Sequence, residues 1–194
     1  SIYAAVAAWL SDSAAAEATY GHISTWETGA VTDMEELFCY SSFNEDIGAW
    51  DTSGVTTMAN MFEEATSFNQ DIGDWLVHSV TYMDNMFQEA TSFNQDISSW
   101  NVGAVTDMHD MFKDATAFNQ DLGWCLNNDV DLDDAFDTAQ CESTWCGIVG
   151  GVNCNILPGI GSVMVNWKIR VAVGVWLSNP TGATATYGHI STWE

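Results

Sequence analysis

Hydrophobic and polar positions recur in this chain with a period of about 25 residues. Residues 50–72 read WDTSGVTTMANMFEEATSFNQDI, residues 75–97 read WLVHSVTYMDNMFQEATSFNQDI, and residues 100–122 read WNVGAVTDMHDMFKDATAFNQDL. Residues 26–47, WETGAVTDMEELFCYSSFNEDI, form a copy that is one residue shorter. A fixed period of this length predicts a solenoid, in which each coil buries its apolar face against its neighbours.

Apolar side chains occupy the same positions in each copy and should form columns through the core. The short Thr/Val segment favours a strand, and the Met-x-x-Met-Phe-x-x-Ala spacing favours one or two helical turns. We therefore predict an α/β fold, a solenoid of about five coils that each combine a strand and a short helix. The predicted columns are those of Trp (Trp26, Trp50, Trp75, Trp100, Trp124), Met (Met34, Met58, Met83, Met108) and Phe (Phe38, Phe62, Phe87, Phe112).

The ends of a solenoid need caps, because they would otherwise expose core side chains and an unpaired edge. A helix over residues 2–11 would place Ile2, Val6, Trp9 and Leu10 on one apolar face. At the other end a degenerate coil begins at Trp124 and runs into a cysteine cluster. We expect an N-terminal helical cap in 1–25, four repeats in 26–123, and a degenerate coil with a cysteine-rich cap in 124–154.

A longer periodicity suggests that the units are arranged in tandem. Residues 168–194 repeat residues 1–27, with 17 of 27 positions identical. We interpret the chain as one full unit followed by the start of the next; the alternative is a complete protein with a duplicated cap. Residues 155–167 form a connector that is apolar, unlike the polar linkers that usually separate independent domains. The connector residues expected to be buried in a joint between units are Ile156, Ile160, Val163, Val165 and Trp167.

The charge of the chain limits its partners. There are 27 Asp and Glu residues against Lys113, Lys168 and Arg170, which gives a net charge of −24. Nucleic acid and anionic membrane surfaces are excluded as partners, because binding them requires basic patches. The apolar run 156–165 is too short to span a bilayer, so no membrane insertion is predicted. A saline or calcium-rich exterior, which would screen the charge, suits such a chain.

Four of the five cysteines follow the last good repeat: Cys125, Cys141, Cys146 and Cys154. Four cysteines allow three pairings, and proximity in sequence favours Cys125–Cys141 and Cys146–Cys154. A zinc site is the weaker alternative, since the spacing contains no CxxC and no histidine is near. Disulfides would imply an oxidising, extracellular setting. Cys39 is interpreted either as a buried thiol of the first coil or as a link between subunits.

The run WDTSGVTTMANMFEEATSFNQDIGDW resembles the repeats of BspA-like leucine-rich surface proteins of bacteria, mycoplasmas and protists. The resemblance extends from Thr19 to about Phe136. The lead-in YGHISTWET and the tail CLNNDVDLDDAF are similar to those of algal or stramenopile members. This resemblance implies a leucine-rich-repeat-like solenoid, a secreted or cell-surface location, and an adhesive or structural role. It supplies no catalytic residue to carry over.

Two polar columns are candidate binding features. The Asn column (Asn44, Asn69, Asn94, Asn119) is expected to bond backbone groups of adjacent coils. The Asp column is expected to satisfy turn amides, and a calcium ladder is the weaker alternative, because clustered carboxylates suit hard cations. The weak calcium candidates are Asp46, Asp71, Asp96 and Asp121.

No grouping of catalytic residues can be argued from the spacing, so we predict neither an enzyme nor a cofactor. The sequence favours a non-enzymatic extracellular structural protein whose tandem units join head to tail into a fibre or surface filament. Its partners would be neighbouring copies of the same unit, with glycans or calcium as further candidates. The alternative is a cell-surface adhesin or receptor with flexible tandem solenoids that bind a glycan or a protein.

Overall fold

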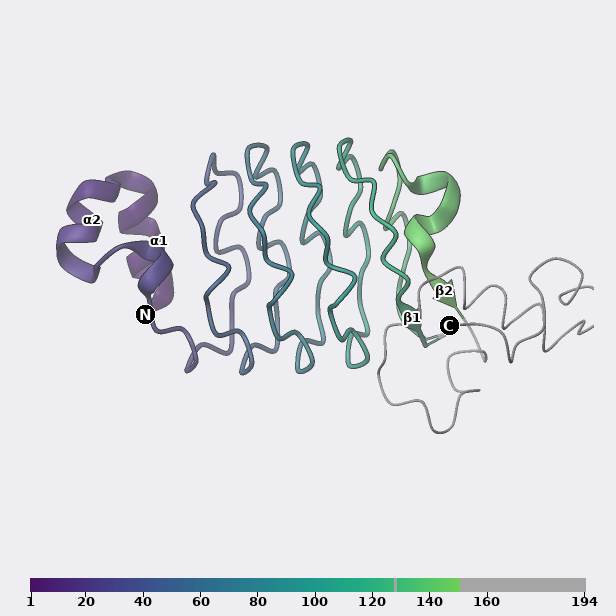
Figure 1. Cartoon of the computed structure of the whole chain (residues 1–194), viewed down its shortest axis with the longest axis horizontal. Coiled ribbons are helices and arrows are strands. Elements are labelled where there is room, and N and C mark those ends of the chain that lie inside the picture. The colour runs from purple at the N-terminus through teal and green to yellow at the C-terminus, as the bar shows by residue number, and fades with distance from the viewer. Residues whose placement is uncertain (128, 151–194) are drawn as a thin grey trace, which may run out of the picture.

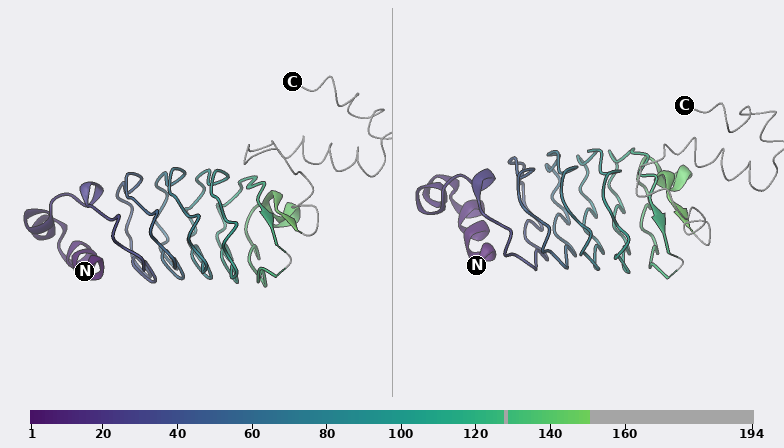
Figure 2. Two further views of the ribbon diagram at one scale, coloured as in Figure 1. Left: turned by 90° about the horizontal axis from the view of Figure 1, so that it is seen from below. Right: turned by 60° about the horizontal axis from the view of Figure 1, so that its bottom comes forward.

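The computed structural model describes residues 1–127 and 129–150. Cys154, the connector 155–167 and the second copy at 168–194 lie outside the described residues. Two helices are followed by a row of stacked coils, and short elements β1, η2 and β2 end the described chain (Figure 1). Figure 2 shows from two further sides that successive coils lie beside one another along the row. We number the coils in chain order as 26–47, 50–72, 75–97, 100–122 and 124–142.

The N-terminal end of the row carries α1 (Ile2–Ser11), which confirms the helix predicted over residues 2–11. Val6 and Trp9 are buried, as their positions on the predicted apolar face require. Leu10 was expected on the same face but is 42% exposed. One residue step turns an α-helix by about 100°, so Leu10 lies beside the narrow stripe that Val6 and Trp9 define.

A second helix, α2 (Ser13–Tyr20), follows directly and was not predicted. Asp12 separates the two helices, and its carboxylate accepts a hydrogen bond from the N–H of Ala15 at 3.1 Å, which caps α2. Ala16 is the buried residue of α2. The short 3₁₀ helix η1 (Ile23–Thr25) then leads into the first coil.

Neighbouring coils are joined by backbone hydrogen bonds. Each coil contributes one residue to a run of parallel bridges, Asp33–Thr57–Tyr82–Asp107–Asp131. Beyond the bridge, alternate N–H groups donate to the next coil, as Asn60 does to the carbonyl of Asp84 at 2.9 Å. The intervening N–H groups donate three residues back within their own coil, as Glu63 does to Asn60 at 3.2 Å. The two sets together pair most N–H groups of this stretch in the first four coils.

The short helix predicted for each coil is wrong for the described repeats, and the predicted strand is reduced to one bridged residue in each coil. The stretch expected to be helical is a series of turns, because Asn60 and Glu64 have positive φ angles of 56° and 52°. A left-handed residue interrupts the i→i−4 pattern of an α-helix and directs N–H groups toward the next coil. The same pair of positions recurs in the other coils as Glu36 and Tyr40, Asn85 and Glu89, Asp110 and Asp114, and Asp134 and Thr138.

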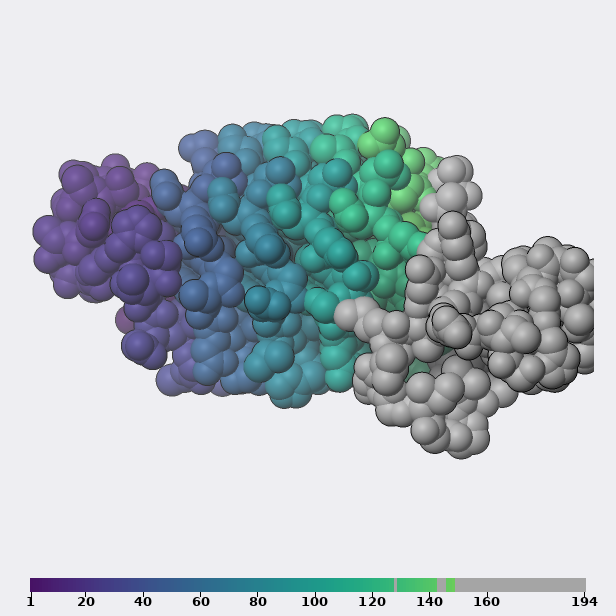
Figure 3. Space-filling model, in the orientation of Figure 1, coloured from purple at the N-terminus to yellow at the C-terminus, as the bar shows by residue number. Residues whose placement is uncertain are grey.

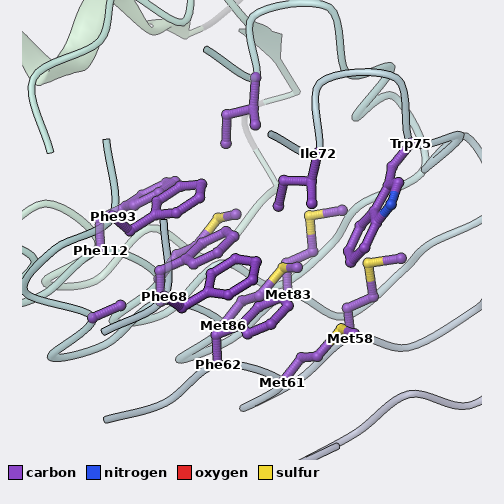
Figure 4. Packing of buried hydrophobic residues seen from close by; sticks show 14 of the residues in the cluster. Met58, Met61, Phe62, Phe68, Ile72, Trp75, Met83, Met86, Phe93 and Phe112 are labelled. Carbon is purple, nitrogen blue, oxygen red and sulfur yellow. The ribbon is translucent and has the colours of Figure 1, made fainter. Parts of the chain in front are cut away.

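The core runs along the whole row of coils. The predicted Met and Phe columns are buried, with Met58 and Phe87 each 0% exposed. Phenyl rings of successive coils stack in register, and the ring centroid of Phe62 lies 5.5 Å from those of Phe38 and Phe87. Figure 4 shows Phe62, Phe68, Phe93 and Phe112 among the packed core side chains. Each coil therefore depends on its two neighbours for its core, as in other stacked-repeat architectures.

The fifth coil leads into the cysteine-rich end. β1 (Cys125–Leu126) pairs in parallel with β2 (Val149–Gly150), and the 3₁₀ helix η2 (Glu142–Gly147) precedes β2. Cys141 and Cys146 form a disulfide, so the expected pairings Cys125–Cys141 and Cys146–Cys154 are wrong. The turn at η2 brings the two Cα atoms to 4.8 Å, and the N–H of Cys146 donates to the carbonyl of Cys141 at 3.1 Å. Cys125 is disulfide-bonded as well.

Candidate functional site

A ladder of Asn and Gln side chains is the most regular polar feature of the stack. The side-chain oxygen of Asn94 accepts hydrogen bonds from the backbone N–H of Asn119 and from the carboxamide of Gln120, each at 2.9 Å. Gln120 also donates to the backbone carbonyl of Asn94 at 2.8 Å. Asn44 and Asn69 accept equivalent bonds from the coils that follow them. The predicted role of the Asn column, to bond adjacent coils, is confirmed.

The Asp column serves the turns of its own coils. The Oδ1 atom of Asp46 accepts from the N–H of Gly48 at 2.9 Å, and Asp71 and Asp96 make the same contact two residues ahead. Asp121 has the equivalent position in the fourth coil. Among the described residues, no three His, Cys, Asp or Glu side chains lie together in a way that could hold a metal ion. The structure thus shows turn capping by Asp46, Asp71 and Asp96, and the calcium alternative stays a prediction.

Two further sets of side chains link the coils and were missed by sequence reasoning. The hydroxyl groups of Thr81 and Thr106 donate to the carbonyls of Thr56 and Thr81 at 3.1 and 3.2 Å. The indole N–H of Trp75 donates to the carbonyl of Ile47 at 3.1 Å. The Gln side chains of the ladder were missed too. The recurrence of these Thr, Trp and Gln residues at fixed positions of the repeat was the signal that could have revealed their role.

Trp124, the last member of the Trp column, breaks this pattern. It is buried and stacks on Trp100 at a centroid distance of 6.3 Å, but its indole N–H has no hydrogen-bond partner among the described residues. Only Gly123 separates Leu122 from Trp124, whereas two residues stand at this place in the earlier coils. Gly123 has a positive φ of 55°. We attribute the unpaired indole to this shortened turn.

Asp84 and Lys113 each interact with an acidic side chain of a neighbouring coil. Burial, and then the neighbouring carboxylate of Asp107, raise the pKa of the half-buried Asp84 above its usual value. Lys113 joins the fourth and fifth coils, since its Nζ lies 3.1 Å from Asp110 and 3.4 Å from Asp134. The hydrogen bond to Asp110 raises the pKa of Lys113.

Cys39 is a free, half-buried thiol at the junction of the first two coils. Its Sγ donates a hydrogen bond to Oε2 of Glu63 at 3.3 Å, and the hydroxyl of Tyr40 donates to Oε1 at 2.9 Å. Burial, and then the contact with Glu63, raise the pKa of Cys39 to about 12. The thiol is therefore protonated and weakly nucleophilic at neutral pH.

The end of the fifth coil contains a depression of about 420 Å³, lined by Leu132, Asp133, Asp134, Ala135, Phe136, Asp137 and Glu142. Four of these residues are acidic, and Ala135 and Phe136 are buried. In the coil before, the N–H of Asp110 donates to the carbonyl of Asp133 at 3.0 Å. The equivalent N–H of Asp134 has no hydrogen-bond partner among the described residues, because no described coil follows.

The middle coils form a continuous surface on the face shown in Figure 3.

The predicted joint and the question of a membrane span concern different parts of the chain. The joint residues Ile156, Ile160, Val163, Val165 and Trp167 lie outside the described residues, so their burial stays a prediction. In the part of the chain that the structure describes, no helix is long and apolar enough to cross a membrane.

Comparison with protein families matches residues 10–143 to the family described as Mycoplasma protein of unknown function, DUF285. The match includes all five coils and α2, and the chain belongs to this family. No curated protein matches the chain, and no solved structure matches it.

Proposed function

We propose that this DUF285 chain is a non-enzymatic structural protein of the cell exterior, built of leucine-rich-repeat-like solenoid units that join head to tail into a fibre or surface filament. The observation that carries the proposal is that the regularly spaced polar side chains form hydrogen bonds between neighbouring coils. The Asn, Gln and Thr columns bond one coil to the next instead of converging on a pocket. The ordered polar side chains of the molecule thus stabilise the stacking of coils along its axis.

The two ends of the stack support a head-to-tail arrangement. One end carries the helices α1 and α2, and the other carries the disulfide-linked segment after the fifth coil. Contacts between two different surfaces are heterologous, and they generate an open filament when the rotation does not close. The repetition of the cap sequence at 168–194 supports a next unit on the same chain. Covalent connection removes most of the entropic cost of association, so a modest interface suffices.

Charge and cysteine chemistry support a location outside the cell. A net charge of −24 keeps neighbouring stacks apart at low ionic strength, and salt or divalent cations reduce this repulsion. The disulfide between Cys141 and Cys146 suits an oxidising compartment. The resemblance of the repeats to BspA-like surface proteins, algal or stramenopile members in particular, agrees with the same location.

An adhesin with flexible tandem units is the second candidate. Tyr82 belongs to the run of parallel bridges between coils, and its side chain is 52% exposed. Thr57 and Asp107 flank it in the adjacent coils. An exposed aromatic ring between hydrogen-bonding side chains is a suitable contact for a sugar ring or a protein side chain. This function would need the face of the stack rather than its ends.

Electron microscopy of the native surface material tests the proposal. The filament proposal expects fibres whose axial repeat equals the length of one unit. Particles joined by variable angles, like beads on a string, would contradict the filament and favour the adhesin.

A further inference from the structure

We propose that Tyr40 is a site of oxidative coupling, at which two copies of this chain are joined through a dityrosine bond. The proposal goes beyond the function above, which concerns units joined along one chain. Three observations carry it: an exposed ring, a carboxylate that binds its hydroxyl group, and the contrast with two exposed tyrosines that have no such carboxylate.

The chain places its phenol rings at the surface and its phenyl rings in the core. Every Phe ring of the described chain is buried, whereas the tyrosines described there are exposed: Tyr3, Tyr20, Tyr40 and Tyr82. Tyr40 is the most exposed of them, at 66%. Its ring is therefore open both to an oxidant in solution and to the ring of a second copy.

Tyr40 is held to Glu63 of the second coil at two points. Its backbone N–H donates to the carbonyl of Glu63 at 2.8 Å, and its hydroxyl donates to Oε1 at 2.9 Å. The other carboxylate oxygen, Oε2, accepts from the thiol of Cys39 at 3.3 Å. Because backbone and side chain are both bonded, the fold holds the phenol and the carboxylate together at the junction of the two coils.

The other exposed tyrosines provide a comparison. The hydroxyl of Tyr3 also donates to a carboxylate, that of Asp33 at 2.8 Å, but Tyr3 is less exposed, at 40%. The hydroxyls of Tyr20 and Tyr82 form no hydrogen bond with the described residues. Among the described tyrosines, Tyr40 thus combines the greatest exposure with a base in contact.

The carboxylate of Glu63 supplies what oxidation of a phenol requires, a base for the hydroxyl proton. Removal of one electron makes the hydroxyl strongly acidic, and Oε1, 2.9 Å away, lies within the distance for direct proton transfer. The electron passes to the oxidant and the proton to Glu63, which leaves a neutral phenoxyl radical on Tyr40. Glu63 then releases the proton to solvent.

Two such radicals, one from each copy, combine. A carbon–carbon bond forms between ring carbons next to the hydroxyl-bearing positions, and each of these carbons gives up its hydrogen to the phenol oxygen as the ring becomes aromatic again. The oxidant is hydrogen peroxide used by a haem peroxidase, and it takes up two electrons and two protons. Two tyrosines and one hydrogen peroxide thus give one dityrosine and two waters.

The thiol of Cys39 is the competing group, because it shares the carboxylate of Glu63. Cys39 is half-buried, whereas Tyr40 is largely exposed. A second copy can therefore meet the Tyr40 ring more readily than the Cys39 sulfur. A disulfide through Cys39 is the product that the experiment must distinguish from dityrosine.

Treatment of the 194-residue chain with a haem peroxidase and hydrogen peroxide tests the site. High ionic strength is needed, because it reduces the repulsion between copies that each carry a net charge of −24. We expect dimers that persist on a reducing gel and show dityrosine fluorescence. Mass spectrometry should find Tyr40 at both ends of the main cross-linked peptide.

Matched substitutions separate the ring from the base. Tyr40→Phe should lower the dimer yield severalfold, and Tyr82→Phe, at another exposed tyrosine, should leave it unchanged. Glu63→Gln keeps a hydrogen-bond acceptor but loses the base, so it should slow dimer formation roughly tenfold or more. Glu64→Gln removes the same charge from the exposed neighbour and should leave the rate unchanged. Thermal melts show that each variant is folded before the rates are compared.

Main products at Tyr20, at Tyr82 or at Tyr187, which lies outside the described residues, would overturn the site. Dimers that disappear on reduction or in Cys39→Ser would do the same, because they are disulfides. Glu63→Gln that couples at the wild-type rate would overturn the role of the carboxylate and with it the proposal. The test uses separate chains in solution, so its result is independent of the filament proposal.

Discussion

At the scale of single residues, indole N–H groups tie one coil to the one before it. Trp75→Phe removes the hydrogen bond to the carbonyl of Ile47, which keeps only the bond from the backbone N–H of Trp50 at 3.1 Å. Trp124→Phe removes a similarly buried ring, but its N–H has no partner among the described residues to lose. We expect Trp75→Phe to lower the free energy of unfolding by roughly 0.5–1.5 kcal/mol more than Trp124→Phe does.

Urea unfolding of the two variants side by side measures this difference, and Trp124→Phe controls for the smaller ring. Equal losses would show that the indole hydrogen bond does not contribute to holding the coils together.

The Cys39 thiol should be unreactive in the folded protein. Its pKa of about 12 leaves almost no thiolate at pH 8, so alkylation by iodoacetamide should be roughly a hundredfold or more slower than in the urea-unfolded chain. Glu63→Gln removes the nearby charge and should speed the reaction in the folded state. Folded protein that reacts as fast as unfolded protein would contradict the contact with Glu63.

Asp84 should make stability depend on pH. Its folded pKa is raised, so the native state binds this proton more tightly than the unfolded state does. The free energy of unfolding therefore falls as pH rises from the usual aspartate pKa through the raised one. Asp84→Asn should give a small rise in Tm at pH 7 that disappears near pH 3. Thermal melts at both values check this, with the exposed Asp74→Asn as control; a gain independent of pH would contradict the assignment.

At the scale of elements, the turn segments show what the sequence could and could not predict. The buried columns follow from the period alone, because a position that recurs in every coil meets its own copies in the stack. The helix was predicted wrongly because Met-x-x-Met-Phe spacing fits both a helical turn and this series of turns. Asn60 and Asn85 at the first left-handed position were a usable signal, since Asn tolerates positive φ. Glu64 and Glu89 at the second position gave no such signal.

The cysteine pairing was beyond sequence reasoning for a different reason. Proximity along the chain was the basis for predicting Cys125–Cys141 and Cys146–Cys154, but which cysteines meet depends on the backbone path. The short turn at η2 brings Cys141 and Cys146 together, and no residue pattern announced it. The depression on the fifth coil was also missed, because it arises where the regular coils stop.

The Asn ladder allows a matched test within one element type. Asn94 accepts two hydrogen bonds from the fourth coil, whereas the side chain of Asn119, at the end of the ladder, accepts none from the described residues. Asn94→Ala should cost about 1 kcal/mol of unfolding free energy, and Asn119→Ala should cost clearly less. Chemical unfolding measures both; equal costs would mean that the ladder does not contribute through its inter-coil bonds.

At the scale of the whole molecule, stacking and tandem arrangement are separate properties. Stacking is visible in the hydrogen bonds that join all five coils. The tandem arrangement is a proposal that rests on the repetition of residues 1–27 at 168–194, and we expect residues 155–167 to set the rigidity of the joint. Repetition in a sequence can indicate tandem units, but the angle between units depends on contacts that no periodicity encodes.

The rigidity of the joint is the central claim, and it can be measured on a chain of two consecutive units. Small-angle X-ray scattering of that chain should give the profile of one elongated rod. Val163→Asp with Val165→Asp should loosen the joint while each stack stays folded, because charged side chains would oppose burial of the connector. A wild-type profile that already matches two independently moving bodies, unchanged by the double substitution, would contradict the account.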